Sequence, residues 1–385
     1  MLKYRAELFA GAILLGAAIR IVAYPLPGST DVPIFRVWSH VAASEGVARL
    51  YGTGGRFPER RALEYDGVRT KVDYPPLALY ELARASPKAL AFVGDAVLAG
   101  LLFAFARRAV LAFWLNPAIV LLGAVLGYLD VLYLAPALAS LLLAREGRPV
   151  LAGALFAAAC LTKPLAILVA PAIVAGLPAG RASLGRFVAS AAAAAAFIVL
   201  PVILAGGFLN MLWGVGSLLR DPYLTAAAAN VWLLAAPLVA HVPIDVLRVA
   251  GGAMTAIAIG WAAARTGRTR DACALAALAG FSIHAYALLA VSVHENHLAG
   301  AIPFLALASA AEKRFAPVLA VVSAIAALNM NVFYGLGVGI GWALPRTMAG
   351  VDVMVVLALA DAAALAWHAT VAFTPRASRV LPQPA

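Results

Sequence analysis

Charged side chains are scarce in this sequence. Asp, Glu, Lys and Arg make up 12% of its 385 residues, whereas soluble proteins carry about 25%. Hydrophobic residues make up 64%, and a water-soluble globule cannot bury that much apolar surface. The composition therefore excludes a soluble enzyme, a disordered chain and a collagen-like chain.

Cysteine and acidic residues are also few. The two cysteines, Cys160 and Cys273, lie inside apolar runs, so a small disulfide scaffold is excluded. The 18 acidic residues stand against 29 basic ones, which gives a net charge of +11. Basic residues at membrane surfaces account for this excess, and no nucleic-acid partner is expected.

Long apolar runs are what the sequence has in abundance. A membrane-spanning barrel would alternate apolar and polar residues, but the runs here are continuous and close to the length of a spanning helix. We therefore predict an all-α polytopic membrane protein with about 12 transmembrane helices. The twelve runs lie near 8–26, 89–106, 109–127, 131–144, 150–162, 164–178, 187–206, 244–264, 272–292, 298–311, 316–335 and 348–372.

Charges in the short loops predict the orientation. If the N-terminus, with Lys3 and Arg5, is cytoplasmic, the other short basic loops face the cytoplasm as well. All short basic loops fall on the cytoplasmic side only if residues 150–178 cross the membrane twice. We therefore predict two short helices there, broken at Lys163–Pro164, where proline favours a new helix start. The alternatives are a single kinked helix or a re-entrant hairpin.

The whole chain, 1–385, is expected to form a single integral membrane domain. An outer loop at 28–88 has no strand pattern, but residues 32–47 have the pattern of an amphipathic helix with Trp38 at headgroup depth. A second outer loop, 207–243, is partly apolar and lies on the membrane or dips into it as a re-entrant loop.

Three polar residues bracket the first outer loop. Asp31 follows the first span and precedes the amphipathic helix, so it suits a helix cap. A capping carboxylate keeps one oxygen free, which also makes Asp31 a candidate general base. Asp73 and Tyr74 lie in Asp-Tyr-Pro-Pro-Leu, where the loop returns to the membrane; alone, Pro-Pro is only a turn signal.

Asp130 and Lys163 are ionisable residues in apolar surroundings. Asp130 follows Gly127-Tyr-Leu and is either an interfacial turn carboxylate or a buried acid with a partner. Lys163 interrupts two apolar half-helices. It either extends its amine to the interface or, beside a new helix N-terminus, binds an anion such as a phosphate.

The segment Val293-His-Glu-Asn-His297 is dense in polar groups for a turn between spans. It is not the HExxH zinc motif, because position 298 is leucine. Hydrogen bonds from His294, Glu295 and His297 to a phosphate or a sugar suit it better than a metal ion does, so we predict no cofactor.

Asp95 and Asp361 lie within spans and favour a different function. They are typical of a proton-coupled transporter or a lipid-sugar flippase. No internal repeat of the kind common in transporters is visible. A membrane scaffold is the third alternative, and it leaves the polar residues of the outer loops unexplained.

Together these motifs resemble the GT-C fold of integral-membrane glycosyltransferases that use a polyprenyl-phosphate sugar. Asp-Tyr-Pro-Pro-Leu and Val-His-Glu are similar to the dolichyl-phosphate-glucose glucosyltransferases of asparagine-linked glycan synthesis. The acid after the first span and Lys-Pro are shared with prokaryotic polyprenyl-phosphate-mannose mannosyltransferases. The segments that carry the resemblance are 30–38, 73–77, 161–164, 229–232 and 293–295.

Two departures limit what the resemblance implies. Glu295 is followed by Asn where those glucosyltransferases are expected to have Lys, so the hexose stays open between mannose and glucose. The Trp-Trp-Asp signature of oligosaccharyltransferases is absent, which disfavours transfer of whole oligosaccharides.

The resemblance implies a hexosyltransferase that inverts the anomeric centre with Asp31 as general base. It implies a polyprenyl- or dolichyl-phosphate sugar donor, a lipid-linked or glycan acceptor and a site facing outside the cell, or the lumen of the endoplasmic reticulum in a eukaryote. Its implied donor-site residues are Lys163, His294, Glu295, Arg346, Asn230 and Trp232, with Asp73, Tyr74, Asp130 and His297 in support.

Overall fold

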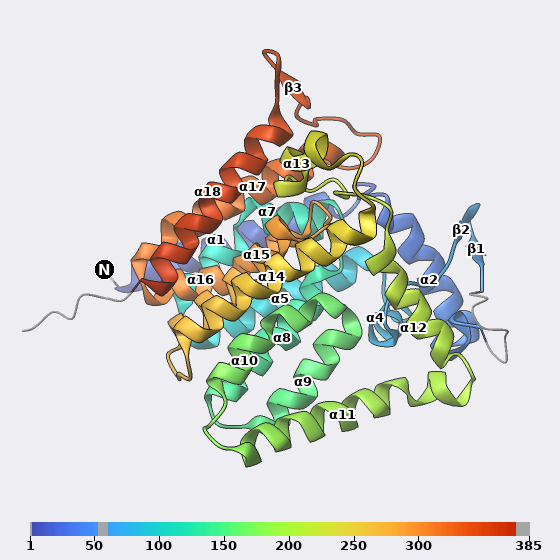
Figure 1. Cartoon of the computed structure of the whole chain (residues 1–385), viewed down its shortest axis with the longest axis horizontal. Helices are drawn as coiled ribbons and strands as arrows, with labels where there is room; N and C mark the ends of the chain where they lie inside the picture. Colours follow the sequence, from blue (N-terminus) through green and yellow to red (C-terminus); the bar gives the residue numbers. More distant parts are fainter. Residues whose placement is uncertain (1, 53–60, 375–385) are drawn as a thin grey trace, which may run out of the picture.

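A computed structural model of the protein describes residues 2–52 and 61–374 (Figure 1). Over these residues the chain is mostly helical, as the apolar runs predict. The strands of this part form two short hairpins only, β1–β2 and β3–β4. The protein is thus an all-α polytopic membrane protein.

Seven helical segments in the described ranges are long and apolar enough to cross a membrane. An eighth is counted if α6 (Arg107–Trp114) is joined to α7 (Pro117–Ile119) and η1 (Val120–Val125), which follow after a bend of 54°. The seven comprise α1 (Leu2–Ala23), α5 (Pro87–Phe105), α11 (Arg181–Leu204), α14 (Ile244–Thr266), α15 (Ala272–Leu289), η5 (Lys313–Phe315) continued by α17 (Ala316–Tyr334), and α18 (Val353–Phe373).

The expected count of twelve spans is not confirmed, because several apolar runs form shorter helices. The 14 residues of α9 (Pro149–Thr162) reach about 21 Å, less than the roughly 30 Å of a hydrocarbon core. The other short apolar helices are η2 (Pro164–Val169) with α10 (Ala170–Gly176), and η4 (His297–Ala301) with α16 (Ile302–Ala311). The helix break predicted at Lys163–Pro164 is confirmed, since α9 ends at Thr162 and η2 begins at Pro164.

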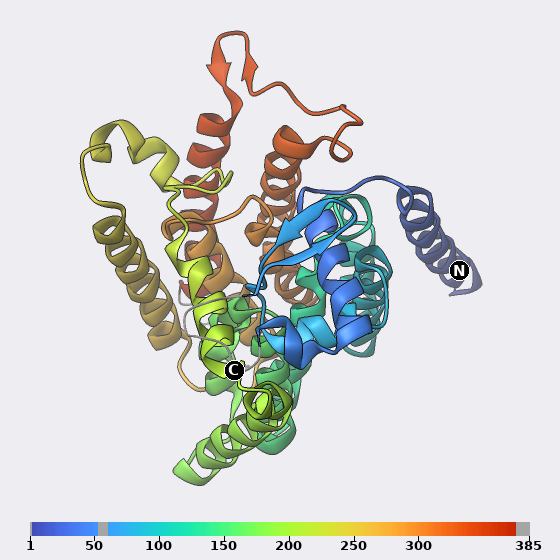
Figure 2. The same cartoon turned by 90° about the vertical axis from the view of Figure 1, so that its right-hand side faces the viewer.

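The main hydrophobic core lies around α15. Almost all of α15 and α16 is buried, and α15 packs against α10, α14, α16 and α18. Figures 1 and 2 show α14 and α18 lying beside it. Helix α8 (Asp130–Arg145) packs against α9 and α5. Buried helices of this kind can carry the polar residues of a site, because protein rather than lipid surrounds them.

The segment 28–88 forms a small structure of its own beside these helices. It contains α2 (Asp31–Glu45), α3 (Val47–Leu50), β1 (Leu63–Tyr65), β2 (Val68–Thr70) and α4 (Pro76–Leu82), while residues 53–60 lie outside the described ranges. The predicted amphipathic helix is therefore present as α2. Its Trp38 is 2% exposed and packs against Phe35 and Tyr74, so protein surrounds the indole. Its depth at the headgroups stays a prediction.

The hairpin β1–β2 corrects the expectation that this segment lacks strands. Leu63 pairs with Thr70 and Tyr65 with Val68, leaving a two-residue turn. The turn residues Asp66 and Gly67 have φ values of 52° and 74°. Such Asp-Gly turns match the twist of an antiparallel pair, so Asp-Gly is the sequence signal for the hairpin.

The segment 207–243 contains α12 (Phe208–Ser217), η3 (Leu218–Arg220) and α13 (Val231–Val239). Residues between η3 and α13 run beside the segment that follows α15, because Ala226 donates its backbone N–H to Val293 O at 3.0 Å. The chain between α17 and α18 ends in the second hairpin, β3 (Thr347–Met348) and β4 (Val351–Asp352).

Candidate functional site

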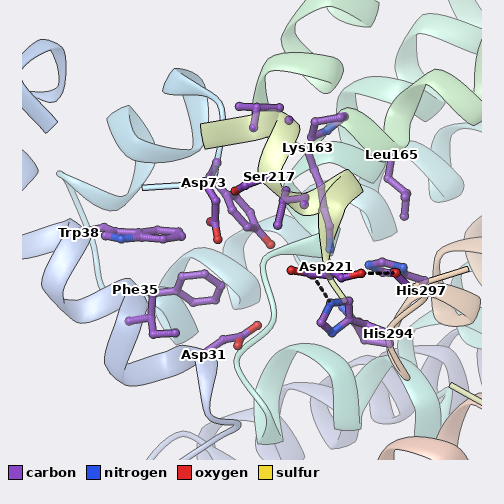
Figure 3. A pocket seen from close by; sticks show the side chains of 18 of the residues that line it. Asp31, Phe35, Trp38, Asp73, Lys163, Leu165, Ser217, Asp221, His294 and His297 are labelled. Atoms are coloured by element: carbon purple, nitrogen blue, oxygen red, sulfur yellow. Dashed lines mark hydrogen bonds and ion pairs between the residues drawn. The ribbon is translucent and has the colours of Figure 1, made fainter. Parts of the chain in front are cut away.

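A cavity of about 300 Å³ lies where five distant parts of the chain meet. Its walls come from α2, residues 73–74, the break between α9 and η2, the end of α12 with the residues after it, and Tyr286 of α15 with the segment 292–297. Figure 3 shows Asp31 on one side and His294 on the other, with the Lys163 side chain descending on the side of His294 and Asp221. The three residues singled out for donor and acceptor chemistry thus line one cavity.

Asp31 is the first residue of α2 and faces this cavity. Thr30 occupies the cap position, and no side-chain capping bond is made there, so Asp31 is not the cap that the sequence suggests. Burial raises the pKa of the Asp31 carboxyl, while the positive charges of His294 and Lys163 oppose this shift. The cavity therefore holds a carboxylate with increased basicity at the start of a helix.

Lys163 has extended backbone between α9 and η2, which carries its side chain out of the helical path. Its Nζ donates a hydrogen bond of 2.8 Å to Asp130 Oδ1, and Asn296 Nδ2 donates one of 2.8 Å to Asp130 Oδ2. Asp130 is 1% exposed and Lys163 is 8% exposed. Asp130 is therefore the buried acid with a partner, which is one of the two alternatives left open by the sequence. Lys163 lines the cavity.

The segment after α15 is fixed by the chain that precedes α13. Ser292 Oγ donates to Asp221 O at 3.1 Å and to Tyr223 O at 2.8 Å. The His294 imidazole lies 3.9 Å from the Asp221 carboxylate, measured from Nε2 to Oδ2. His297 is buried in the cavity wall, next to the rings of Tyr286 and His294.

Glu295 does not line the cavity. The Tyr128 hydroxyl donates a hydrogen bond to Glu295 Oε1. The Glu295 side chain is almost completely buried, and this burial raises its pKa to about 7. The negative charge of Asp31 acts in the same direction. Whether the Glu295 carboxyl is protonated therefore depends on the charges of the cavity.

An aromatic cluster lies on the α2 side of the cavity, across from Lys163 and His294 (Figure 3). The ring centroids of Phe35, Trp38 and Tyr74 are 5.4–5.8 Å apart in pairs. Tyr51 donates its hydroxyl to Tyr74 O at 2.7 Å, which holds the start of the Asp-Tyr-Pro-Pro-Leu motif in place. Asp73 and Tyr74 both line the cavity, as the sequence predicts for the end of the first outer loop.

Four of the six expected donor-site residues do not line this cavity: Glu295, described above, and Asn230, Trp232 and Arg346. Asn230 caps α13 by accepting from Trp232 N and also donates to Ala290 O. The Trp232 indole donates to Leu289 O at 2.7 Å. Both residues thus hold α13 against the end of α15. Arg346 is exposed and pairs with Asp352 at 3.2 Å.

The acids expected of a transporter are paired inside the helices. Asp95 accepts from Arg20 Nε at 2.7 Å, and both side chains are buried. Asp361 of α18 lies 3.0 Å from His284 Nε2 of α15, and His284 Nδ1 lies 3.4 Å from His368 Nδ1. None of these residues lines the cavity that holds Asp31.

Sequence reasoning missed Asp221, Tyr128 and Tyr286 as residues of this region. Tyr128 stands two residues before Asp130, which is the one available signal. Asp221 and Tyr286 are brought to the cavity by tertiary packing alone. In the part of the chain that the structure describes, no group of three or more His, Cys, Asp or Glu side chains is arranged to hold a metal ion.

No protein-family model matches this sequence, and no curated protein matches it. The fold and the cavity define the class: a polytopic helical membrane protein with a charged cavity built from distant segments.

Proposed function

We propose that this protein is a membrane glycosyltransferase of the GT-C type, which transfers a mannose or glucose unit from a polyprenyl- or dolichyl-phosphate sugar. The acceptor is lipid-linked or a glycan, and the reaction takes place on the extracytoplasmic side of the membrane. The observation that carries the proposal is the convergence of Asp31, Lys163 and His294 on one cavity. These residues come from segments more than 100 residues apart.

The cavity offers a group for each requirement of sugar transfer. Asp31 removes the proton from the acceptor hydroxyl. The acceptor oxygen bonds to the anomeric carbon as the bond from that carbon to the phosphate oxygen breaks, with inversion. Both electrons of the broken bond leave with the lipid phosphate, whose growing negative charge is stabilised by Lys163 and by hydrogen bonds from His294.

The wall of Phe35, Trp38 and Tyr74 supplies the apolar contacts. Sugar rings and isoprenoid chains both present C–H surface, and aromatic faces bind such surface well. Leu165 and Leu218 extend the apolar lining toward η2 and η3. One end of the cavity thus suits a hexose phosphate, while its aromatic side suits the less polar parts of the donor.

The test is sugar transfer by the full chain in detergent or nanodiscs. The donors are short-chain polyprenyl-phosphate mannose and polyprenyl-phosphate glucose, with membrane lipid extract as acceptor. We expect turnover with one donor and a loss of at least 100-fold in Asp31→Asn. Asp66→Asn is the matched control, because Asp66 is an exposed turn residue and Asn accepts its positive φ equally well.

Equal thermal unfolding temperatures of the two variants establish that the loss is chemical. Unchanged turnover in Asp31→Asn excludes Asp31 as the base. Lack of both turnover and donor binding with the wild-type chain overturns the glycosyltransferase proposal.

The second candidate is a proton-coupled transporter or lipid-sugar flippase. The contact chain Asp361–His284–His368 between α18 and α15 favours it, because ionisable groups within spans are typical of proton pathways. Proton uptake into proteoliposomes that is abolished in Asp361→Asn supports this candidate. Uptake that equals the rate of empty liposomes excludes it.

A further inference from the structure

The connection between α17 and α18 exposes several large apolar side chains, although it is not part of a spanning helix. Six large apolar side chains of this connection are between 36 and 82% exposed. They are Leu336, Val338, Ile340, Trp342, Met348 and Val351. A soluble surface exposes such residues singly, whereas a contiguous set marks an interaction surface.

The backbone of this connection turns its apolar side chains outward. Residues 335–342 alternate glycine with an apolar residue, and the four glycines have φ values between 55° and 124°. Leu336 N donates to Gly341 O at 3.2 Å, and Leu344 N donates to Asn331 Oδ1 at 3.0 Å. These bonds fix the main chain, so the exposure of its apolar side chains belongs to the folded loop.

Trp342 is the most exposed large apolar residue of the described chain, at 82%. Its φ of 61° lies in the left-handed region, which costs a non-glycine residue free energy and is retained only where the surroundings hold it. Indole rings are enriched where the bilayer meets water. A strained backbone that presents an indole outward fits an interfacial anchor.

We propose that residues 336–351 insert into the interfacial layer of the bilayer, with lipid as the partner that covers their apolar side chains. Helix α17 ends at Tyr334 and α18 begins at Val353, and both belong to the candidate spans. A connection between the ends of two spans lies at the membrane surface. Figures 1 and 2 show the hairpin β3–β4 projecting beyond the end of α18.

The composition of the loop favours lipid over a protein partner. Apolar residues and Trp342 suit the acyl and carbonyl region, while Arg346 beside the hairpin suits the phosphates of the headgroups. Arg346 was expected in the donor site; in this position its guanidinium has a role at the membrane surface instead.

The loop is also bonded to the turn that precedes Asp31. Val338 N donates to Gly28 O at 2.9 Å, and the Tyr334 hydroxyl lies 3.3 Å from Thr30 Oγ1. A side chain at position 337 would meet Gly28 N at 3.2 Å, which explains the glycine at this contact. These contacts therefore hold the proposed membrane-inserting loop and the start of α2 together.

The test places an environment-sensitive dye on the loop of the full chain. Cys160 and Cys273 are replaced by alanine, and Ile340→Cys is labelled with a nitrobenzoxadiazole dye. The protein is reconstituted in phosphatidylcholine vesicles, with or without bromine on the lipid chains. Glu64→Cys, on the exposed face of β1, is the matched control that stays in water.

We expect blue-shifted emission from the dye at position 340, with at least twofold quenching by brominated lipid. The dye at position 64 shows neither effect. In a second measurement, Trp342→Phe removes a component of the tryptophan emission that brominated lipid quenches.

Emission from position 340 that is quenched by aqueous iodide and not by brominated lipid overturns the proposal. Blue-shifted emission that brominated lipid does not quench also overturns it, because a second copy of the chain then covers the loop. Neither readout requires sugar transfer, so the outcome is independent of the proposed enzymatic function.

Discussion

Lys163, in the wall of the cavity, forms an ion pair of 2.8 Å with Asp130, although 33 residues separate them in the chain. Asn296 binds the second oxygen of the same carboxylate. A nearly buried ammonium requires such partners, since a charge without one is costly to remove from water. The pair therefore fixes where the cavity presents its positive charge.

Asp130→Asn is expected to lower stability by about 3–5 kcal/mol, because it leaves the Lys163 charge without its counter-charge. The double variant Asp130→Leu with Lys163→Met removes both charges and is expected to regain most of this loss. Unfolding followed by circular dichroism in detergent measures both. Equal stability of the Asp130→Asn variant and the wild type would contradict a structural pair.

The double variant also separates stability from donor binding. This variant is expected to fold but lacks the ammonium that is proposed to face the donor phosphate. It is therefore expected to bind a short-chain polyprenyl-phosphate sugar at least tenfold more weakly. Undiminished binding would show that Lys163 serves packing alone.

Under the proposed function, the pH dependence of sugar transfer is expected to report on Asp31. A general base works in its ionised form, so kcat/KM falls as the pH drops through the raised pKa of Asp31. The positive charge of His294 lowers that pKa, and His294→Gln is therefore expected to move the acidic limb to higher pH. The control is His40→Gln, because His40 stacks on Tyr65 and does not line the cavity. An acidic limb that stays in place in His294→Gln would contradict the interaction.

Glu295 gives a pH dependence of stability with the opposite sign to that of most carboxylates. Its pKa is about 7 in the folded protein and 4.5 in the unfolded chain, so folding takes up a proton between these values. The resulting contribution of Glu295 to the free energy of unfolding is fully present below about pH 4.5 and is lost as the pH rises to about 7.

Thermal unfolding of wild type and Glu295→Gln measures the Glu295 contribution. We expect the unfolding temperature of the wild type, relative to that of Glu295→Gln, to be higher at pH 5 than at pH 7.5. Glu64→Gln, on an exposed strand, is expected to show no such change. A constant difference between wild type and Glu295→Gln would mean that Glu295 is ionised throughout.

Substitutions of Arg20 and Asp95 test the transporter alternative. Their buried pair joins α1 to α5, and the Arg20 guanidinium also stacks on Trp114 at 3.9 Å. We expect Asp95→Asn to destabilise the protein by about 3–5 kcal/mol. The double variant Arg20→Met with Asp95→Leu is expected to fold and to keep sugar transfer. Proton uptake by the wild type that disappears in this folded double variant would instead favour transport.

The helical, membrane-embedded character and the break at Lys163–Pro164 were predictable, because long apolar runs and proline act locally. Asp130 was left open between an interfacial turn carboxylate and a buried acid with a partner, and Lys163 was not identified as that partner. The hairpin at Asp66–Gly67 was missed, although its turn signal is present, because its strands have three residues each.

Donor-site residues were less predictable, because a motif does not reveal where its side chains point. Asn230 and Trp232 stand in a motif, yet they secure α13. Asp221 has no motif and reaches the cavity through the pairing of residues near Ala226 with the segment after α15. The predicted number of crossings is not confirmed for a related reason. Hydropathy detects apolar runs, but a run inside a protein core need not have the length of a bilayer.

Since the cavity draws on residues from 31 to 297, it has consequences for biosynthesis. When the ribosome has made the first 200 residues, Asp31, Asp130 and Lys163 are already in the nascent chain. His294, Asn296 and Asp221 are still to come. A chain arrested before α15 can form the ion pair but not the cavity. We therefore expect two separately expressed halves, split between α13 and α14, to be inactive alone and to regain activity only when they associate in one membrane.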